Sequence, residues 1–329
     1  KSRRVAELAV AISRELGIES DSCERAALLA KCDLLTNMVG EFPELQGTMG
    51  YYYALHDGEP ESVALAITEQ YQPRFSGDAV PSSETGAVLA VAEKLDTICG
   101  LFVIGQPPTG SKDPFALRRA ALGTLRILVE KSLDLNLAQA IKQSLASYEA
   151  QGVSVDAETG SQVFEFMLER FRAWYLGEGV STEVFQAVME LKPERPLDFA
   201  MRVNAVQRFS QLPESAALAA ANKRVSNILQ KENQQHTVVD QALLSEAAEK
   251  DLANAVAEMR SVVDPLFEKR EYTQGLEKLA AMRPVVDAFF DQVLVMADDD
   301  AVRQNRLALL SELRALFLKV ADISSLHRS

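Results

Sequence analysis

The chain has 329 residues, of which 47% are hydrophobic and 25% charged, and its formal net charge is −13. This is the composition of a soluble globular protein with room for two or three domains. No apolar run reaches the ~18 residues of a membrane span, so we expect no membrane contact. The three widely spaced cysteines favour a cytoplasmic protein, because the cytoplasm is reducing. Because residue 1 is Lys1 rather than Met, we treat the chain as a fragment.

The distribution of charge along the chain and the number of cysteines and histidines exclude further classes of protein. Residues 1–192 carry 17 Lys and Arg against 27 Asp and Glu, and residues 193–329 carry 17 against 20. Neither part is basic enough for a non-specific nucleic-acid binder, and we expect no DNA partner. Three widely spaced cysteines and three scattered histidines fit neither a disulfide framework nor a zinc site.

The first third predicts three helices. Residues 2–18 place apolar side chains on one stripe with charges opposite, and Gly17 is suited to end that helix. Residues 23–39 are apolar on most sides, which predicts one buried helix. A third helix is expected over residues 84–105, ending near Gly105.

The middle of the chain predicts one helix over 111–133, with Asp113 as its cap and Pro114 in its first position. A Gly-containing stretch at 149–161 marks a domain boundary. Two short helices, 162–179 and 181–191, follow, and the Pro-containing segment 192–199 marks a second boundary.

The last third is predicted to be helical again, and three prolines are expected to mark helix boundaries: Pro213, Pro265 and Pro284. The expected helices are about 197–211, 214–231, 242–259, 272–296 and 299–320. Asp298, Asp299 and Asp300 precede the last of these, where negative charge stabilises a helix N-terminus. No strand pair or Gly-rich phosphate loop stands out, so we predict an all-α protein.

Residues 1–100 resemble an HD domain, a helical fold whose metal centre uses a first His, a His-Asp doublet and a distant Asp. In "ALLAKCDLLTNMVGEFPELQG" the doublet position holds Cys32-Asp33, or Ala30-Lys31 in the ungapped alignment. Lys1 occupies the position of the first His, and Asp96 in "AVAEKLDTI" matches the final Asp. An ammonium repels a metal cation, and both imidazoles are missing. We therefore expect no metal, with Asp33 and Asp96 capping helices or pairing with Lys and Arg.

Longer strings resemble another family. "KCDLLTNMVGEFPELQGTMGYYYA", "QPPTGSKDPFALRRAALGTLRIL" and "ALAAANKRVSNILQK" are similar to the β subunit of the bacterial two-subunit glycyl-tRNA synthetase, and the resemblance covers essentially the whole chain. It implies a degenerate HD-like domain at 1–150, a helical linker at 151–198 and a helical-bundle anticodon-binding domain at 199–329.

The resemblance also implies a division of labour. The α subunit holds the catalytic core with ATP and Mg, whereas this chain has no catalytic residue and binds no cofactor of its own. Its partners would be tRNA-Gly and the α subunit, in an α2β2 assembly. Two alternatives stay open: a divergent metal-dependent HD phosphohydrolase, and a helical scaffold without RNA contact.

Candidate RNA contacts in the anticodon-binding domain are Arg and Lys, which bind phosphates, and Asn, which reads the edges of splayed bases. They are Arg202, Arg208, Asn222, Lys223, Arg224, Asn227, Arg303, Asn305 and Arg306. In the helix around residue 223, Val225, Ile228 and Leu229 should turn inward.

These candidates have structural alternatives. Arg303 and Arg306 could pair instead with Asp298–Asp300 or Asp287, and the aromatic pair Phe289 and Phe290 fits a core as well as base stacking.

In the HD-like domain a basic stripe is expected to contact the tRNA acceptor arm or another subunit: Lys112, Arg118, Arg119 and Arg126. Residues 40–58 are predicted to form a Gly-punctuated hairpin between helices. Its run Tyr51-Tyr52-Tyr53 fits either a partner-facing surface or simple packing.

Overall fold

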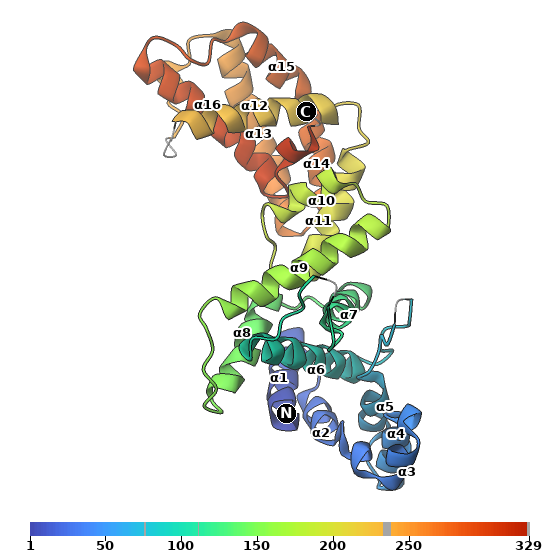
Figure 1. Cartoon of the computed structure of the whole chain (residues 1–329). Coiled ribbons are helices and arrows are strands. Elements are labelled where there is room, and N and C mark those ends of the chain that lie inside the picture. Colours follow the sequence, from blue (N-terminus) through green and yellow to red (C-terminus); the bar gives the residue numbers. More distant parts are fainter. Residues whose placement is uncertain (76, 111, 233–237, 328–329) are drawn as a thin grey trace. The chain divides into compact units, whose positions relative to one another are not determined.

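A computed structural model describes residues 1–75, 77–110, 112–232 and 238–327. Within these ranges it contains sixteen α-helices, four short 3-10 helices and no β-strand, which confirms the predicted all-α fold (Figure 1). No helix in the described ranges is both long and apolar enough to cross a bilayer. The chain divides into two compact units. Unit 1 comprises Lys1–Tyr175 with Glu194–Leu197, and unit 2 comprises Leu176–Pro193 with Asp198–Ser329.

Unit 1 is built around α6 (Glu84–Val103), which is buried on most of its surface. Ser83 starts this helix by accepting a hydrogen bond from the Gly86 N–H at 2.9 Å. The helices that pack most extensively against α6 are α1 (Ser2–Leu16), α2 (Ser20–Leu29), α5 (Glu61–Glu69), α7 (Leu117–Glu130) and α8 (Leu137–Glu149). The last helix of unit 1, α9 (Thr159–Gly177), begins within the predicted boundary segment at 149–161.

The expected single helix over 23–39 is wrong. The chain forms α2, then the 3-10 helix η1 (Cys32–Leu35), then α3 (Asn37–Glu41). Thr36 lies between them with extended backbone, and its hydroxyl accepts the N–H three residues ahead, so a new helix starts there. The expected burial is also wrong, because four apolar side chains of this segment are exposed: Leu28, Leu34, Leu35 and Met38.

The expected hairpin at 40–58 is wrong as well. The segment contains the 3-10 helix η2 (Pro43–Leu45) and the helix α4 (Thr48–His56). Gly47, with a positive φ of 80°, supplies the turn between them.

The start of α7 differs from the prediction by three residues. The helix begins at Leu117, and Pro114 lies in the preceding turn. Asp113 does cap the helix, because its carboxylate accepts hydrogen bonds from the N–H groups of Leu117 at 2.8 Å and Arg118 at 3.0 Å. An aspartate can therefore cap from a turn that precedes the helix.

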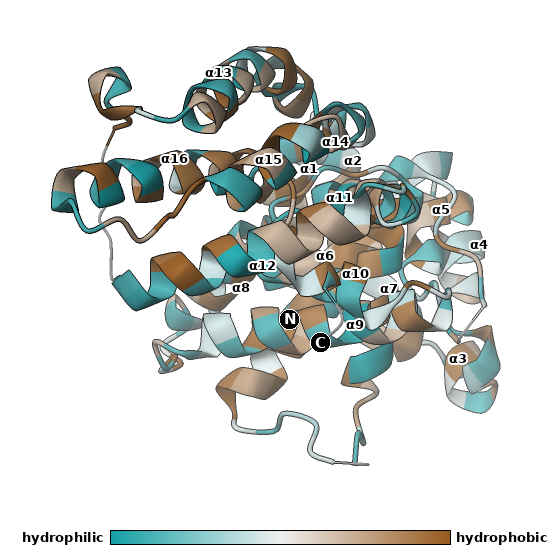
Figure 2. Cartoon of the chain, turned by 90° about the horizontal axis from the view of Figure 1, so that it is seen from above, coloured by the Kyte–Doolittle hydropathy of each residue, from teal (hydrophilic) through white to brown (hydrophobic). Residues whose placement is uncertain are grey.

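Unit 2 is a helical bundle whose fully buried phenylalanines include Phe185, Phe199, Phe209, Phe289 and Phe317. Figure 2 shows hydrophobic and hydrophilic residues alternating along α12 and α16, as expected of helices with one buried side. Its elements are α10 (Thr182–Met189), α11 (Pro196–Phe209), α12 (Ser215–Glu232), η3 (Gln241–Leu243), α13 (Ala247–Glu268), α14 (Tyr272–Ala280), α15 (Arg283–Gln292), α16 (Asp300–Leu318) and η4 (Ile323–Leu326).

The prolines of unit 2 act differently from one another. Pro284 divides the expected helix over 272–296 by occupying the beginning of α15. Pro265 does not end a helix, because α13 continues through it to Glu268. At α16, Asp299 caps the helix as the aspartate run predicts, accepting the Val302 N–H at 3.1 Å.

Candidate RNA-binding site

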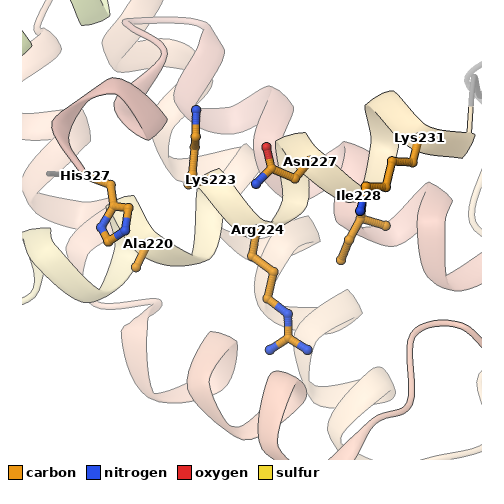
Figure 3. A pocket seen from close by; sticks show the side chains of 7 residues that line it. All are labelled: Ala220, Lys223, Arg224, Asn227, Ile228, Lys231 and His327. Carbon is orange, nitrogen blue, oxygen red and sulfur yellow. The ribbon is translucent and has the colours of Figure 1, made fainter. Parts of the chain in front are cut away.

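The exposed side of α12 carries a row of cationic and amide side chains. Lys223, Asn227 and Lys231 recur at intervals of four residues, so they follow one side of the helix, and Arg224 lies beside this row. Together with other residues they line an open cavity of about 460 Å³, whose remaining members are Ala220, Ile228 and His327. Figure 3 shows His327 and Lys231 at opposite ends of this row. We call these seven residues the α12 face.

The opposite side of α12 anchors the helix in unit 2. Val225 is completely buried, as expected, whereas Ile228 and Leu229 are only half-buried. Ile228 therefore adds an apolar side chain to the α12 face. Asn222 is buried rather than exposed, and its amide donates to the Leu218 carbonyl at 3.0 Å.

Arg224 is positioned by an aromatic side chain from α15. Its guanidinium carbon lies 4.5 Å from the centroid of the half-buried Phe290 ring, and that ring meets the buried Phe289 edge-on. Stacking occupies the flat face of a guanidinium and leaves its N–H edges available for a phosphate or a base. Figure 3 shows Lys223 and Arg224 extending in opposite directions from α12, so the two cations can meet different parts of a ligand.

His327 belongs to the α12 face although it lies far from α12 in the sequence. It follows η4, which packs against α12. Asp322 caps η4 by accepting the Ser324 N–H at 3.1 Å, and its carboxylate also accepts from Arg314 at 2.6 Å. These contacts fix the segment that carries His327.

Arg202, also a predicted RNA contact, is bound within unit 2. Its guanidinium pairs with Asp198 at 2.7 Å and donates to the carbonyls of Lys319 and Val320 and to the Tyr272 hydroxyl. Burial, followed by the hydrogen bond to Asp198, raises the pKa of Tyr272 to about 12. Four hydrogen bonds leave little capacity for RNA here, whereas Arg208, near the end of α11, is exposed.

The predicted contacts on α16 also bond inside the domain. Arg303 pairs with Asp300 and donates to the Ala297 carbonyl at 2.9 Å, which is the structural alternative recognised in the sequence. Asn305 is buried, and its side-chain amide exchanges two hydrogen bonds with the backbone of Asp240.

Arg306 is also buried, with its charge paired inside the domain. Its guanidinium donates to Glu249 on α13 and to the Leu294 carbonyl, the latter at 2.7 Å. The expected alternative partners, the aspartates at 287 and 298–300, are therefore not the ones used. Burial alone would raise the pKa of Glu249, but hydrogen bonds from Arg306 and from backbone N–H groups hold that pKa below its usual range.

Three arginines of the predicted basic stripe in unit 1 form hydrogen bonds or an ion pair within the chain. Arg118 donates to the Gly110 carbonyl at 2.5 Å, Arg119 to the Arg74 carbonyl at 3.0 Å, and Arg126 pairs with Glu130 at 2.6 Å. Lys112 and Arg119 are exposed. Neutralisation of Arg126 by Glu130 weakens the stripe as a phosphate site.

At the positions that the sequence aligned with an HD metal centre, the structure brings cations together. The Lys1 ammonium lies 2.8 Å from a Glu93 carboxylate oxygen, and the Lys31 ammonium lies 3.7 Å from the same oxygen. Burial alone would raise the pKa of Glu93, but these two cations lower it. Two ammonium groups thus converge on one carboxylate, an arrangement that repels a divalent cation.

The two aspartates of the HD-like frame have structural partners. Asp96 forms a two-point contact with Arg4, at 2.8 and 3.3 Å, which confirms the expected pairing with arginine. The buried Asp33 accepts the Gly47 N–H at 2.6 Å. Cys32 is exposed, and among the described residues no three His, Cys, Asp or Glu side chains group as metal ligands. These residues do not fit a metal centre.

Sequence reasoning missed two of the polar members of the α12 face, Lys231 and His327. Lys231 lies seven residues after Arg224, so the helical repeat that singled out Lys223 and Asn227 could have included it. His327 lies 100 residues from Asn227, and nothing in the local sequence links it to α12.

Comparison with known proteins assigns both parts of the chain. Residues 1–190 match the family model described as glycyl-tRNA synthetase beta subunit, and residues 218–323 match that of the DALR anticodon binding domain. The second match contains every member of the α12 face except His327.

Curated relatives agree over nearly the full chain. The glycine–tRNA ligase beta subunit of Pseudomonas aeruginosa (strain PAO1) is 56% identical over 328 residues, which are 99% of this chain and 48% of the relative. The subunit of Marinobacter nauticus is 54% identical over 330 residues, and that of Pasteurella multocida is 52% identical over 328 residues; each match covers 99% of this chain and 47% of the relative. The chain spans about half the length of the curated relatives it matches. It belongs to the glycyl-tRNA synthetase beta subunit family.

Proposed function

We propose that this chain is the tRNA-binding and assembly part of a glycine–tRNA ligase beta subunit in the cytoplasm. In this proposal unit 2 binds the anticodon loop of tRNA-Gly through the α12 face. The partner alpha subunit, where ATP and Mg bind, activates glycine and transfers it to the tRNA. The proposal rests on the family membership and on the match of residues 218–323 to an anticodon binding domain.

The observation that supports it most directly is the unpaired charge of the α12 face. Lys223, Arg224 and Lys231 take part in none of the ion pairs among the described residues, although the chain as a whole is acidic. By contrast, Arg202, Arg303 and Arg306 are each paired with a carboxylate. Uncompensated cations around a cavity are expected where phosphates bind, because they attract the backbone without first breaking an internal ion pair.

The composition of the α12 face suits an unpaired loop better than a duplex. Single-stranded RNA is recognised by cations on phosphates and by amides and planar groups on exposed bases. Asn227 offers both a donor and acceptor for a base edge, Arg224 offers a planar group already stacked on Phe290, and Ile228 offers an apolar contact. Lys223 and Lys231 are left for phosphates.

The test is tRNA-Gly binding by the full subunit at two or more salt concentrations. Lys223→Ala, Arg224→Ala and Lys231→Ala should each weaken binding about 10-fold, and each should reduce the salt dependence of affinity. Asn227→Ala should instead reduce the discrimination between wild-type tRNA and transcripts with altered anticodons.

Lys250→Ala is the matched control, because Lys250 is exposed on α13 outside the α12 face. The Lys250→Ala variant should bind tRNA-Gly with the same affinity as the unmodified protein. If all four α12-face variants bound tRNA-Gly as tightly as this control, the assignment of the anticodon site would be wrong.

A further inference from the structure

Unit 1 exposes a concentration of large apolar side chains between Leu28 and Leu55. Leu35 is 89% exposed, Tyr52 59% and Phe42 51%. Four others in this stretch exceed one third exposure, so that seven apolar side chains within 28 residues face solvent: Leu28, Leu34, Leu35, Met38, Phe42, Tyr52 and Leu55. We call these seven residues the apolar patch.

Six of the seven residues lie in one substructure formed by η1, α3, η2 and α4, and the seventh, Leu28, lies on α2. η1 contacts both α3 and α4, and α3 contacts η2. Figure 1 shows α3 and α4 together with α5 at one end of unit 1. A concentration of exposed apolar side chains on neighbouring elements is typical of an interaction site.

The patch is held in place by tight backbone contacts. The buried carboxylate of Asp33 accepts the Gly47 N–H at 2.6 Å, which ties η1 to the start of α4. Gly50 brings α4 so close to α5 that a Cβ there would lie 2.5 Å from Ile67 Cγ2 and 3.3 Å from Asp33. A surface built on such contacts is preorganised, so binding to it costs little ordering entropy.

The charge around the patch specifies the kind of partner. Residues 32–73 contain no Lys or Arg and seven Asp or Glu. Four of these acids are exposed: Glu41, Glu44, Asp57 and Glu61. The two cations next to Leu28 are both paired, because Arg25 forms an ion pair with Glu59 and the Lys31 ammonium lies 3.7 Å from Glu93. A net acidic surface binds phosphates unfavourably, and two copies of an acidic rim would repel each other. The complement is a protein with an apolar face and a Lys- or Arg-rich rim.

The composition favours a stable subunit contact. Exposed Tyr, Phe, Met and Leu are typical of the buried centre of subunit interfaces, whereas interfaces between domains of one chain are more polar. Family membership implies a second type of subunit. We propose that the apolar patch is the surface on which the beta subunit docks the alpha subunit, with Leu35, Phe42 and Tyr52 as anchors. This proposal rests on the proposed assembly with an alpha subunit, but it does not depend on the anticodon site.

The test measures association of the full beta subunit with purified alpha subunit, without tRNA, by sedimentation velocity and titration calorimetry. Leu35→Glu and Phe42→Ala should each weaken association about 10- to 100-fold, because each removes an apolar anchor. Leu35→Lys should weaken association with the alpha subunit more than Leu35→Glu does, because the introduced lysine faces a basic rim on the partner.

Leu294→Glu is the matched control, because Leu294 is a 71% exposed apolar residue of unit 2. It should leave alpha-subunit affinity unchanged. Circular dichroism and unaltered tRNA-Gly affinity verify that each variant is folded, and they separate this test from that of the anticodon site.

Three outcomes would overturn the proposal. Unchanged alpha-subunit affinity in all three patch variants would exclude docking at this surface. Loss of beta–beta association with unchanged alpha-subunit affinity would assign the patch to a second copy of the chain. Loss of thermal stability in the full beta subunit, again with unchanged alpha-subunit affinity, would assign it to another part of the same polypeptide.

Discussion

Replacing Arg306 by alanine should destabilise unit 2 without affecting RNA binding. The side chain is 6% exposed, and its partner Glu249 is completely buried. Glu249 also accepts the N–H groups of Ser245 and Glu246, both at 2.8 Å, so it is the capping-box glutamate at the start of α13. Removal of Arg306 leaves this carboxylate buried without a counter-ion and the Leu294 carbonyl without its donor.

The expected loss follows from that burial. Breaking a buried ion pair from one side costs about 3 to 5 kcal/mol. Arg303→Ala, three residues earlier on the same helix, is the comparison, because the Asp300 carboxylate that pairs with Arg303 is mostly exposed. A pair of this kind contributes less than about 1 kcal/mol.

Amide hydrogen exchange in α13 and α16 is the appropriate assay, because a chain with two units need not unfold in one step. The opening free energy should fall several times more in Arg306→Ala than in Arg303→Ala. Affinity for tRNA-Gly, measured where both variants are folded, should remain within about twofold of the unmodified protein. Equal stability of the two variants, or a selective loss of RNA affinity in Arg306→Ala, would refute this reasoning.

Three other outcomes can be measured independently. Burial lowers the pKa of Lys94 to about 8. Because the charged lysine is disfavoured in the folded state, the free energy of unfolding should increase as the pH rises from about 8 to 10. Lys94→Met should reduce this pH dependence, measured by urea unfolding at several pH values. Gly86→Ala would place a Cβ 2.8 Å from the Cβ of the buried Glu69, so thermal unfolding should show a loss of about 1 to 3 kcal/mol. Asp299→Ala removes the cap of α16 and should cost about 1 kcal/mol, seen as faster hydrogen exchange confined to the first turn.

Local sequence patterns determined the helical class and many helix ends. The apolar stripe of α1 and the left-handed Gly17 after it depend on neighbours within one or two turns, and so does the Asp299 cap. The cations of α12 could be grouped for the same reason, because helical periodicity alone places Lys223 and Asn227 on one side. Local rules failed between residues 23 and 39, where α2 ends at Leu29 and the Thr36 hydroxyl caps a new helix.

Tertiary structure decided which polar residues remain available for a ligand. Arg306 and Lys223 look equally suitable in the sequence, yet one meets Glu249 from a helix 57 residues away and the other meets no carboxylate among the described residues. His327 reaches α12 only because the chain returns to it after α16. Periodicity reports which side of a helix a residue occupies, but burial and ion pairing depend on what packs against that side. The second property arises only when distant segments meet.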